Sequence, residues 1–120
     1  MDYASIEVKA DEKSVEEFAR AVLKKLGISH VKTRGFPNQD PRVVYIGSAA
    51  GIEVSISETW EADYPFCVSL GLAGSSRSAE YLVEHAHVLA YQWSRDGWRC
   101  RVPKTESAFG RVRKEEIYAP

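Results

Sequence analysis

Residues 58–64 place two large aromatic side chains among three carboxylates. The aromatic residues are Trp60 and Tyr64, and the acids are Glu58, Glu61 and Asp63. Aromatic anchors ringed by charges are typical of protein interfaces, where the rim charges steer the encounter. The same carboxylates could instead act as a general acid and base, or both rings could fold back on the core and leave the acids solvated. Partner binding is the functional hypothesis that this segment supports best.

A second group of polar residues shares one face of a helix that the sequence predicts over residues 76–95. At about 100° per residue, Glu80, Glu84, His87 and Tyr91 fall opposite an apolar stripe. Glu84 and His87 have the Glu-x-x-His spacing with which helical bundles ligate metal ions. Such centres need matching carboxylates from other helices, and this chain contains one Glu-x-x-His. We therefore predict no metal site but a solvated helix face with ordinary charge pairs, or else a contact face for a partner.

Motifs for nucleophilic catalysis or phosphate binding are missing from the sequence. No Gly-x-Ser-x-Gly elbow presents a serine. No Gly-Lys-Ser/Thr follows the turn at Gly74, Ser75 and Ser76, as a phosphate-binding loop requires. We therefore predict no catalytic residue, no cofactor and a protein that is not an enzyme.

The C-terminal part of the chain is basic, which opens a second functional class. Residues 95–120 hold seven Lys or Arg against four Asp or Glu, whereas residues 1–94 hold nine against thirteen. Basic side chains beside an aromatic ring such as Trp98 can hold a phosphate backbone. Against this, Glu115 and Glu116 interrupt the patch, and the net charge of −1 gives no general attraction to nucleic acid or an anionic membrane. The basic residues are Arg95, Arg99, Arg101, Lys104, Arg111, Arg113 and Lys114.

One amphipathic helix is indicated near the start of the chain. Ser14 and Glu17 have the spacing of a capping box, in which each side chain satisfies a free backbone N–H. An apolar stripe follows over residues 15–26, and Gly27 can adopt the left-handed conformation that ends a helix.

Strands surround the two predicted helices. Residues 52–57 and 66–72 alternate most clearly between apolar and small or polar side chains. Weaker strand candidates are 3–9, 28–34, 43–46 and 98–102, and residues 47–51 have the composition of a turn. This order predicts an α+β fold, an antiparallel sheet of about five or six strands with two helices packed on one face. The other face should be small and polar, formed by Ser55, Ser57, Cys67 and Ser69.

The 120 residues suffice for one α+β domain, 1–120, with 103–120 as a C-terminal arm or edge strand. Hydrophobic residues at 44% and charged residues at 28% are typical of soluble globular proteins. No apolar run approaches the roughly 18 residues of a membrane span. The first residues are acidic and have no apolar secretory-signal core, so we expect a cytoplasmic protein. Cys67 and Cys100 are then expected to be reduced, buried thiols.

In general type, the chain resembles the small cytoplasmic immunity proteins that neutralise bacterial polymorphic and contact-dependent toxins. The resemblance lies in the size, the mildly acidic body, the α+β layout without catalytic motifs, and residues 58–64. It implies a tight one-to-one complex with a toxin domain, often with acidic surfaces covering a basic active site, and no cofactor. We accordingly predict a non-enzymatic intracellular protein-binding domain. The alternatives are a nucleic-acid-binding domain and a small-ligand-binding or enzymatic domain.

Overall fold

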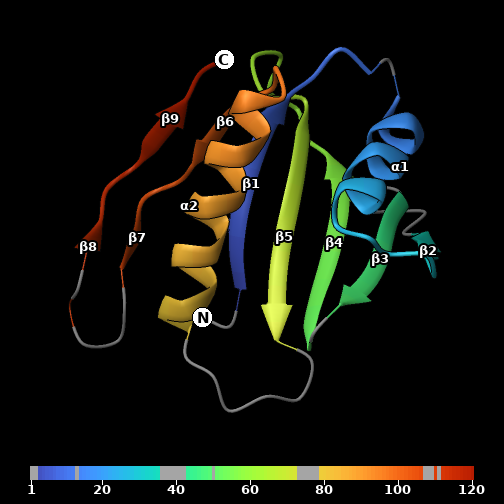
Figure 1. The fold of residues 1–120 in the computed structure, drawn as a ribbon, viewed down its shortest axis with the longest axis horizontal. Helices are drawn as coiled ribbons and strands as arrows, with labels where there is room; N and C mark the ends of the chain where they lie inside the picture. The colour runs from blue at the N-terminus through green and yellow to red at the C-terminus, as the bar shows by residue number, and fades with distance from the viewer. Residues whose placement is uncertain are drawn as a thin grey trace.

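A seven-stranded sheet carries both helices on one face (Figure 1). The computed structural model describes residues 3–12, 14–35, 43–49, 51–72, 79–106, 110 and 112–120. The sheet order is β2-β3-β4-β5-β1-β6-β9, and every hydrogen-bonded pair in it is antiparallel. This confirms the predicted α+β fold, an antiparallel sheet with two helices on one face.

The element bounds are as follows. The sheet contains β1 (Tyr3–Lys9), β2 (Lys32–Gly35), β3 (Val43–Ala49), β4 (Ile52–Glu58), β5 (Phe66–Leu72), β6 (Arg99–Val102) and β9 (Glu116–Tyr118). The helices are α1 (Val15–Lys25) and α2 (Ala79–Arg95). A separate two-stranded ribbon is formed by β7 (Thr105–Glu106) and β8 (Val112–Arg113).

Helix α1 begins and ends where the sequence predicts. The Ser14 hydroxyl accepts a hydrogen bond from the Glu17 N–H at 3.2 Å, which satisfies one of the free donors of the first turn. Leu26 caps the other end, and Gly27 follows with φ of 71°, a conformation that a glycine adopts without strain. The buried stripe between them packs on the sheet through Phe18, Ala19, Val22 and Leu23.

The core lies between the helices and one face of the sheet. Alternate residues of β1, β4 and β5 are buried there, because successive side chains of a strand point to opposite faces. Phe18 stacks on Phe66 with 4.3 Å between ring centroids, and Trp98 lies 5.2 Å from Phe18 and 5.6 Å from Trp93. Trp98 is therefore a core residue that ties α1 to the end of α2.

The opposite face is small and polar at the centre of the sheet, as predicted. Ser55 pairs with Ser69, and Ser69 pairs with Ser5, so three serines form a row across β4, β5 and β1. In the next row, Cys67 pairs with Glu7, and Glu7 pairs with Arg101. We refer to this side of the sheet as the open face.

Both cysteines are free thiols, and they lie on opposite faces of the sheet. Cys67 shares the open face with Glu7, whereas Cys100 is opposite Val8 and fully buried in the core. Side chains that point away from each other across a sheet cannot be bridged without moving the backbone.

The turn expected over residues 47–51 is shorter than predicted. Strand β3 continues to Ala49, and Gly51, with φ of 79°, belongs to the turn before β4. Gly47 is a strand residue, and a Cβ at that position would lie 2.8 Å from Ile28 Cγ2 and 3.1 Å from Leu23 Cδ2. The glycine is needed there because α1 and the chain after it approach β3 directly.

Other boundaries differ by a few residues. The strand expected at 28–34 is β2, Lys32–Gly35, and the C-terminal segment adds the edge strand β9 to the sheet. Residues 76–78 of the second predicted helix lie outside the described residues. Within the described part of the chain, no helix is both long and apolar enough to cross a membrane.

Candidate functional site

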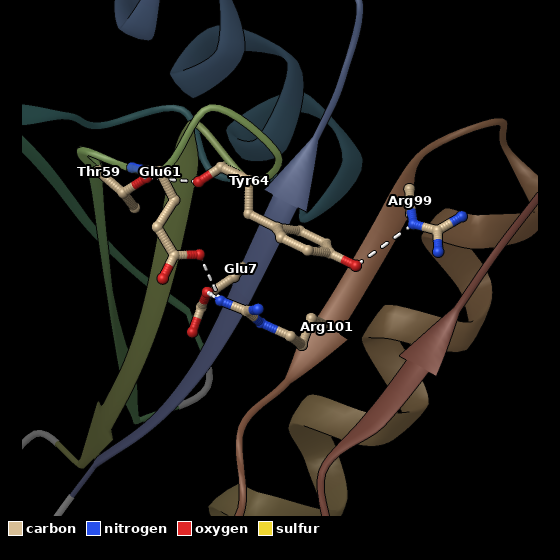
Figure 2. A network of polar contacts seen from close by, with 6 residues as sticks. All are labelled: Glu7, Thr59, Glu61, Tyr64, Arg99 and Arg101. Carbon is tan, nitrogen blue, oxygen red and sulfur yellow. Dashed lines mark hydrogen bonds and ion pairs between the residues drawn. The ribbon is translucent and has the colours of Figure 1, made fainter.

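The connection between β4 and β5, residues 59–65, is held together by its own hydrogen bonds (Figure 2). The Thr59 N–H donates to the Pro65 carbonyl at 2.8 Å, and the Thr59 hydroxyl donates to the Tyr64 carbonyl. The Glu61 N–H donates back to the Thr59 hydroxyl at 3.2 Å. Thr59 therefore closes the base of this connection, which we call the Trp60 loop.

Tyr64 anchors the Trp60 loop to the open face of the sheet. Its side chain is only 5% exposed, yet it lies apart from the hydrophobic core. Figure 2 shows the ring crossing above β1 toward β6, where the Arg99 Nε donates to the Tyr64 hydroxyl at 3.3 Å. The Arg101 guanidinium lies 4.4 Å from the ring centroid, within the range of a cation–π contact.

Arg101 joins the loop to the centre of the sheet through two carboxylates. Its Nη2 donates to Glu7 on β1 and to Glu61 in the Trp60 loop (Figure 2). The side chains of Arg101 and Glu7 are each about one-fifth exposed, at 21% and 19%, so water screens this pair less than a surface pair. Hydrogen bonding to Glu7, the larger cause, and to Glu61 raises the pKa of Arg101 above its ordinary value and keeps the guanidinium charged.

Trp60 is the exception in this anchored loop, because its side chain is 83% exposed. Glu58 and Asp63 are exposed on either side of it in the sequence, and Glu61 is exposed but paired with Arg101. Five residues are predicted to contact a partner. Trp60, Glu58 and Asp63 face solvent, Glu61 is exposed but pairs with Arg101, and Tyr64 is buried. Tyr64 thus supports the surface rather than forming it.

The helix face containing Glu84, His87 and Tyr91 is covered in part by the C-terminal segment. His87 is only 4% exposed, and its Nδ1 lies 2.8 Å from the Tyr118 hydroxyl on β9. The expectation of a solvated face is therefore wrong at His87, because β9 packs against α2 there. Glu84 lies 3.8 Å from Arg113 Nε, and Tyr91 is exposed and contacts Tyr118 edge-on. Glu80 belongs to α2, but its side chain lies outside the described residues.

The basic C-terminal segment directs its arginines toward partners in the same chain. Arg95 donates to the Ala119 carbonyl at 3.3 Å, and Arg113 faces Glu84. Arg99 and Arg101 both project from the open face, where they contact Tyr64, Glu7 and Glu61. Lys104 and Lys114 are exposed, and Arg111 lies outside the described residues.

The Arg101 network could not have been identified from the sequence. Glu7 and Arg101 lie at opposite ends of the chain, and they meet because β1 pairs with β6. The Arg-x-Arg spacing at 99 and 101 is consistent with both side chains lying on one face of a strand, but it does not indicate which carboxylates they meet.

The described residues contain no group of three or more His, Cys, Asp or Glu side chains arranged to bind a metal ion. Comparison of the whole chain with protein-family models, with curated proteins and with solved structures finds no match.

Proposed function

We propose that this chain is a non-enzymatic protein-binding domain that docks its partner through Trp60. The observation that carries the proposal is the contrast within one loop: Tyr64 is 5% exposed and Trp60 is 83% exposed. A tryptophan held in water by an otherwise anchored segment is a suitable hot spot, since Trp is among the residues that dominate binding energy in interfaces.

The anchoring favours binding by reducing the entropy lost on association. Thr59 closes the base of the loop, and Tyr64 and Glu61 fix it to Arg99 and Arg101. A loop that is already ordered in the free protein does not have to be ordered by the partner, and this preorganisation raises affinity.

The charge of the loop indicates the chemistry of the partner surface. Residues 58–65 contain three acids and no base. One of the acids, Glu61, pairs with Arg101, which it shares with Glu7. No ion pair is found for Glu58 or Asp63 among the described residues. We propose that the partner presents an apolar pocket for Trp60 within a basic surface, as an enzyme acting on anionic substrates does. An immunity or inhibitor protein that covers such an active site would have these properties.

The arginine contacts weigh against the nucleic-acid alternative. Arg95, Arg99, Arg101 and Arg113 contact groups of the same chain, and Trp98 is buried in the core. Phosphate binding would have to displace these contacts, and the buried indole is not available for stacking on a base.

The test begins by capturing the partner from a lysate of the source organism with the wild-type protein. Affinity is then measured by calorimetry for wild type, Trp60→Ala and Tyr91→Ala. Tyr91 is a matched control because it is an exposed aromatic residue on another part of the surface. We expect Trp60→Ala to weaken binding by at least about 2 kcal/mol, roughly 30-fold, and Tyr91→Ala to leave it within about twofold.

A second arm tests the charges. Replacing Glu58 and Asp63 by Gln and Asn should slow association and flatten its salt dependence, because rim charges act mainly on the encounter rate. An unchanged affinity of a folded Trp60→Ala variant, or a loss confined to Tyr91→Ala, contradicts the proposed surface. If the captured partner is an enzyme, stoichiometric inhibition of its activity supports the inhibitor role.

A further inference from the structure

The C-terminal strand β9 is attached to the fold by a small number of contacts, and a buried histidine is at their centre. The Tyr118 hydroxyl and His87 Nδ1 are hydrogen-bonded at 2.8 Å, and the two rings meet edge-on with 5.8 Å between centroids. Tyr91 contacts the same ring at 6.4 Å, and Arg95 reaches the Ala119 carbonyl. Only three residue pairs, Cys100–Tyr118, Arg101–Ile117 and Val102–Glu116, join β9 to β6.

The other ring nitrogen of His87 has no hydrogen-bond partner among the residues that the structure describes. His87 Nε2 is buried, and no donor or acceptor in the described part of the chain reaches it. A neutral imidazole tolerates this arrangement with one unpaired nitrogen. An imidazolium does not tolerate it, because both of its nitrogens are N–H donors. The buried Nε2–H would have no acceptor, and the positive charge would be buried with it.

The charged and titratable groups around His87 come from three elements. Glu84 is on α2, Arg113 is on β8, and Glu116 and Tyr118 are on β9. The faces that β1, β5 and β6 turn toward the helices contain apolar side chains and the Cys100 thiol among the described residues. Desolvation is the largest influence, and with the Arg113 charge it outweighs the two carboxylates and lowers the pKa of His87 below 6.5.

We propose that protonation of His87 releases β9 from α2 and from the edge of β6, so that the C-terminal strand is a pH-controlled cover of that edge. When β9 leaves, the imidazolium is hydrated and both of its N–H groups find water. Release also frees one side of Cys100–Val102, and a strand edge with unpaired N–H and C=O groups is able to pair with another chain.

The direction of the pH effect follows from the two states. In the released state His87 titrates near its ordinary value of 6.5, and in the docked state it titrates lower. Docking is therefore fully favourable above about pH 7 and weakens as the pH falls through 6.5, because the released state takes up the proton first. Below the pKa of His87 in the docked state, both states bind the proton and docking weakens no further.

Hydrogen exchange detected by mass spectrometry tests this in the intact protein. Protection of residues 116–118 is measured at about pH 7.5 and about pH 5, with rates corrected for the intrinsic pH dependence of exchange. We expect protection of these residues to be lower at about pH 5, by at most about 30-fold, because the released state titrates near 6.5 and the docked state lower. Protection of β4 and β5 should be unchanged.

Two variants distinguish protonation of His87 from other effects of low pH on the protein. His87→Asn keeps a polar atom near the Nδ1 position but cannot ionise, so β9 should stay docked at both pH values. His85→Asn, on the same helix, should behave as wild type. Equal losses of protection in wild type and His87→Asn would overturn the proposal.

A direct titration keeps the proposal testable even if His87→Asn does not fold. The imidazole resonances of His87 in the wild-type protein are followed by NMR from about pH 8 to about pH 4.5. Ionisation below 6.5 together with loss of the β9 cross-strand contacts supports release. Ionisation at or above 6.5 with those contacts intact excludes it.

Discussion

The guanidinium of Arg101 lies over the ring of Tyr64, with 4.4 Å between Arg101 Cζ and the ring centroid. This pair connects two segments that are far apart in the sequence, the Trp60 loop and strand β6. Through the same guanidinium the loop is joined to Glu7 on β1. The loop that carries the exposed Trp60 is thus bonded to a polar network on the open face.

Arg101→Met tests how much this network stabilises the fold. Methionine can still cover Tyr64, but Glu7 then loses its charged partner in a site where its side chain is 19% exposed. We expect urea unfolding to show a loss of about 1.5–3 kcal/mol, the value of a charge-assisted hydrogen bond. Arg20→Met is the matched control, because the Arg20–Glu16 pair is largely exposed and should contribute less than about 0.5 kcal/mol. Equal stabilities of wild type and Arg101→Met would show that the network does not stabilise the fold.

Tryptophan fluorescence reports directly on the presentation of Trp60. The chain has three tryptophans, of which Trp93 and Trp98 are buried. Acrylamide should therefore quench one component readily, and Trp60→Phe should remove that component and shift the remaining emission to shorter wavelength. The thermal midpoint of Trp60→Phe should match that of wild type, since the exposed Trp60 side chain makes few packing contacts. A uniform, slow quenching in wild type contradicts the exposed position of Trp60.

Gly47→Ala tests the close approach of α1 to β3. The added methyl would lie 2.8 Å from Ile28 Cγ2, too close for an ordinary contact. We expect a destabilisation of about 1–3 kcal/mol in urea unfolding, as for other overpacked sites. In a double-mutant cycle, Ile28→Ala should relieve part of this loss, so the double variant should be more stable than the sum of the single effects predicts. If the two destabilisations were strictly additive, contact with Ile28 would not be the source of the strain in Gly47→Ala.

Stability measured at alkaline pH should reveal how much the protonated Cys100 thiol contributes to the free energy of unfolding. Burial raises the pKa of Cys100 from 9.0 to about 12. The unfolded chain loses this proton near pH 9 and the folded protein near pH 12, so the stabilisation is complete below pH 9 and declines between these values. The advantage of wild type over Cys100→Ala should shrink by up to about 1.4 kcal/mol per pH unit in that window.

Urea unfolding under reducing conditions measures this difference at several pH values. Val8→Ala is the control, because Val8 lies opposite Cys100 in the sheet, is equally buried and does not titrate. The difference between wild type and Val8→Ala should not vary with pH. If the difference for Cys100→Ala is just as constant, the thiol does not have the raised pKa.

Local patterns in the sequence predicted the elements well. The capping serine at 14 and the glycine at 27 defined α1, and alternation defined β4 and β5, because these signals involve neighbours along the chain. The small polar composition of the open face followed from the same alternation.

The arrangement around the Trp60 loop depended on contacts that no local pattern contains. The sequence identified Trp60 and Tyr64 together, but burial separates them, since Tyr64 is covered by residues of β6 that lie some distance along the chain. The tertiary contact that selects a glycine at 47 was equally hidden, and the composition around it was interpreted as a turn. His87 was expected in solvent because the register of β9 against β6 could not be anticipated.

The position of β1 has a consequence for synthesis in the cell. This early strand lies in the middle of the sheet, where Ile6 pairs with Val68 and Val8 pairs with Cys100. While the chain emerges from the ribosome, the apolar side chains of β1 therefore stay unpaired and exposed until β5 and β6 have been translated. Pairings so distant in sequence are slow to form, so chaperone assistance during translation should matter for this protein.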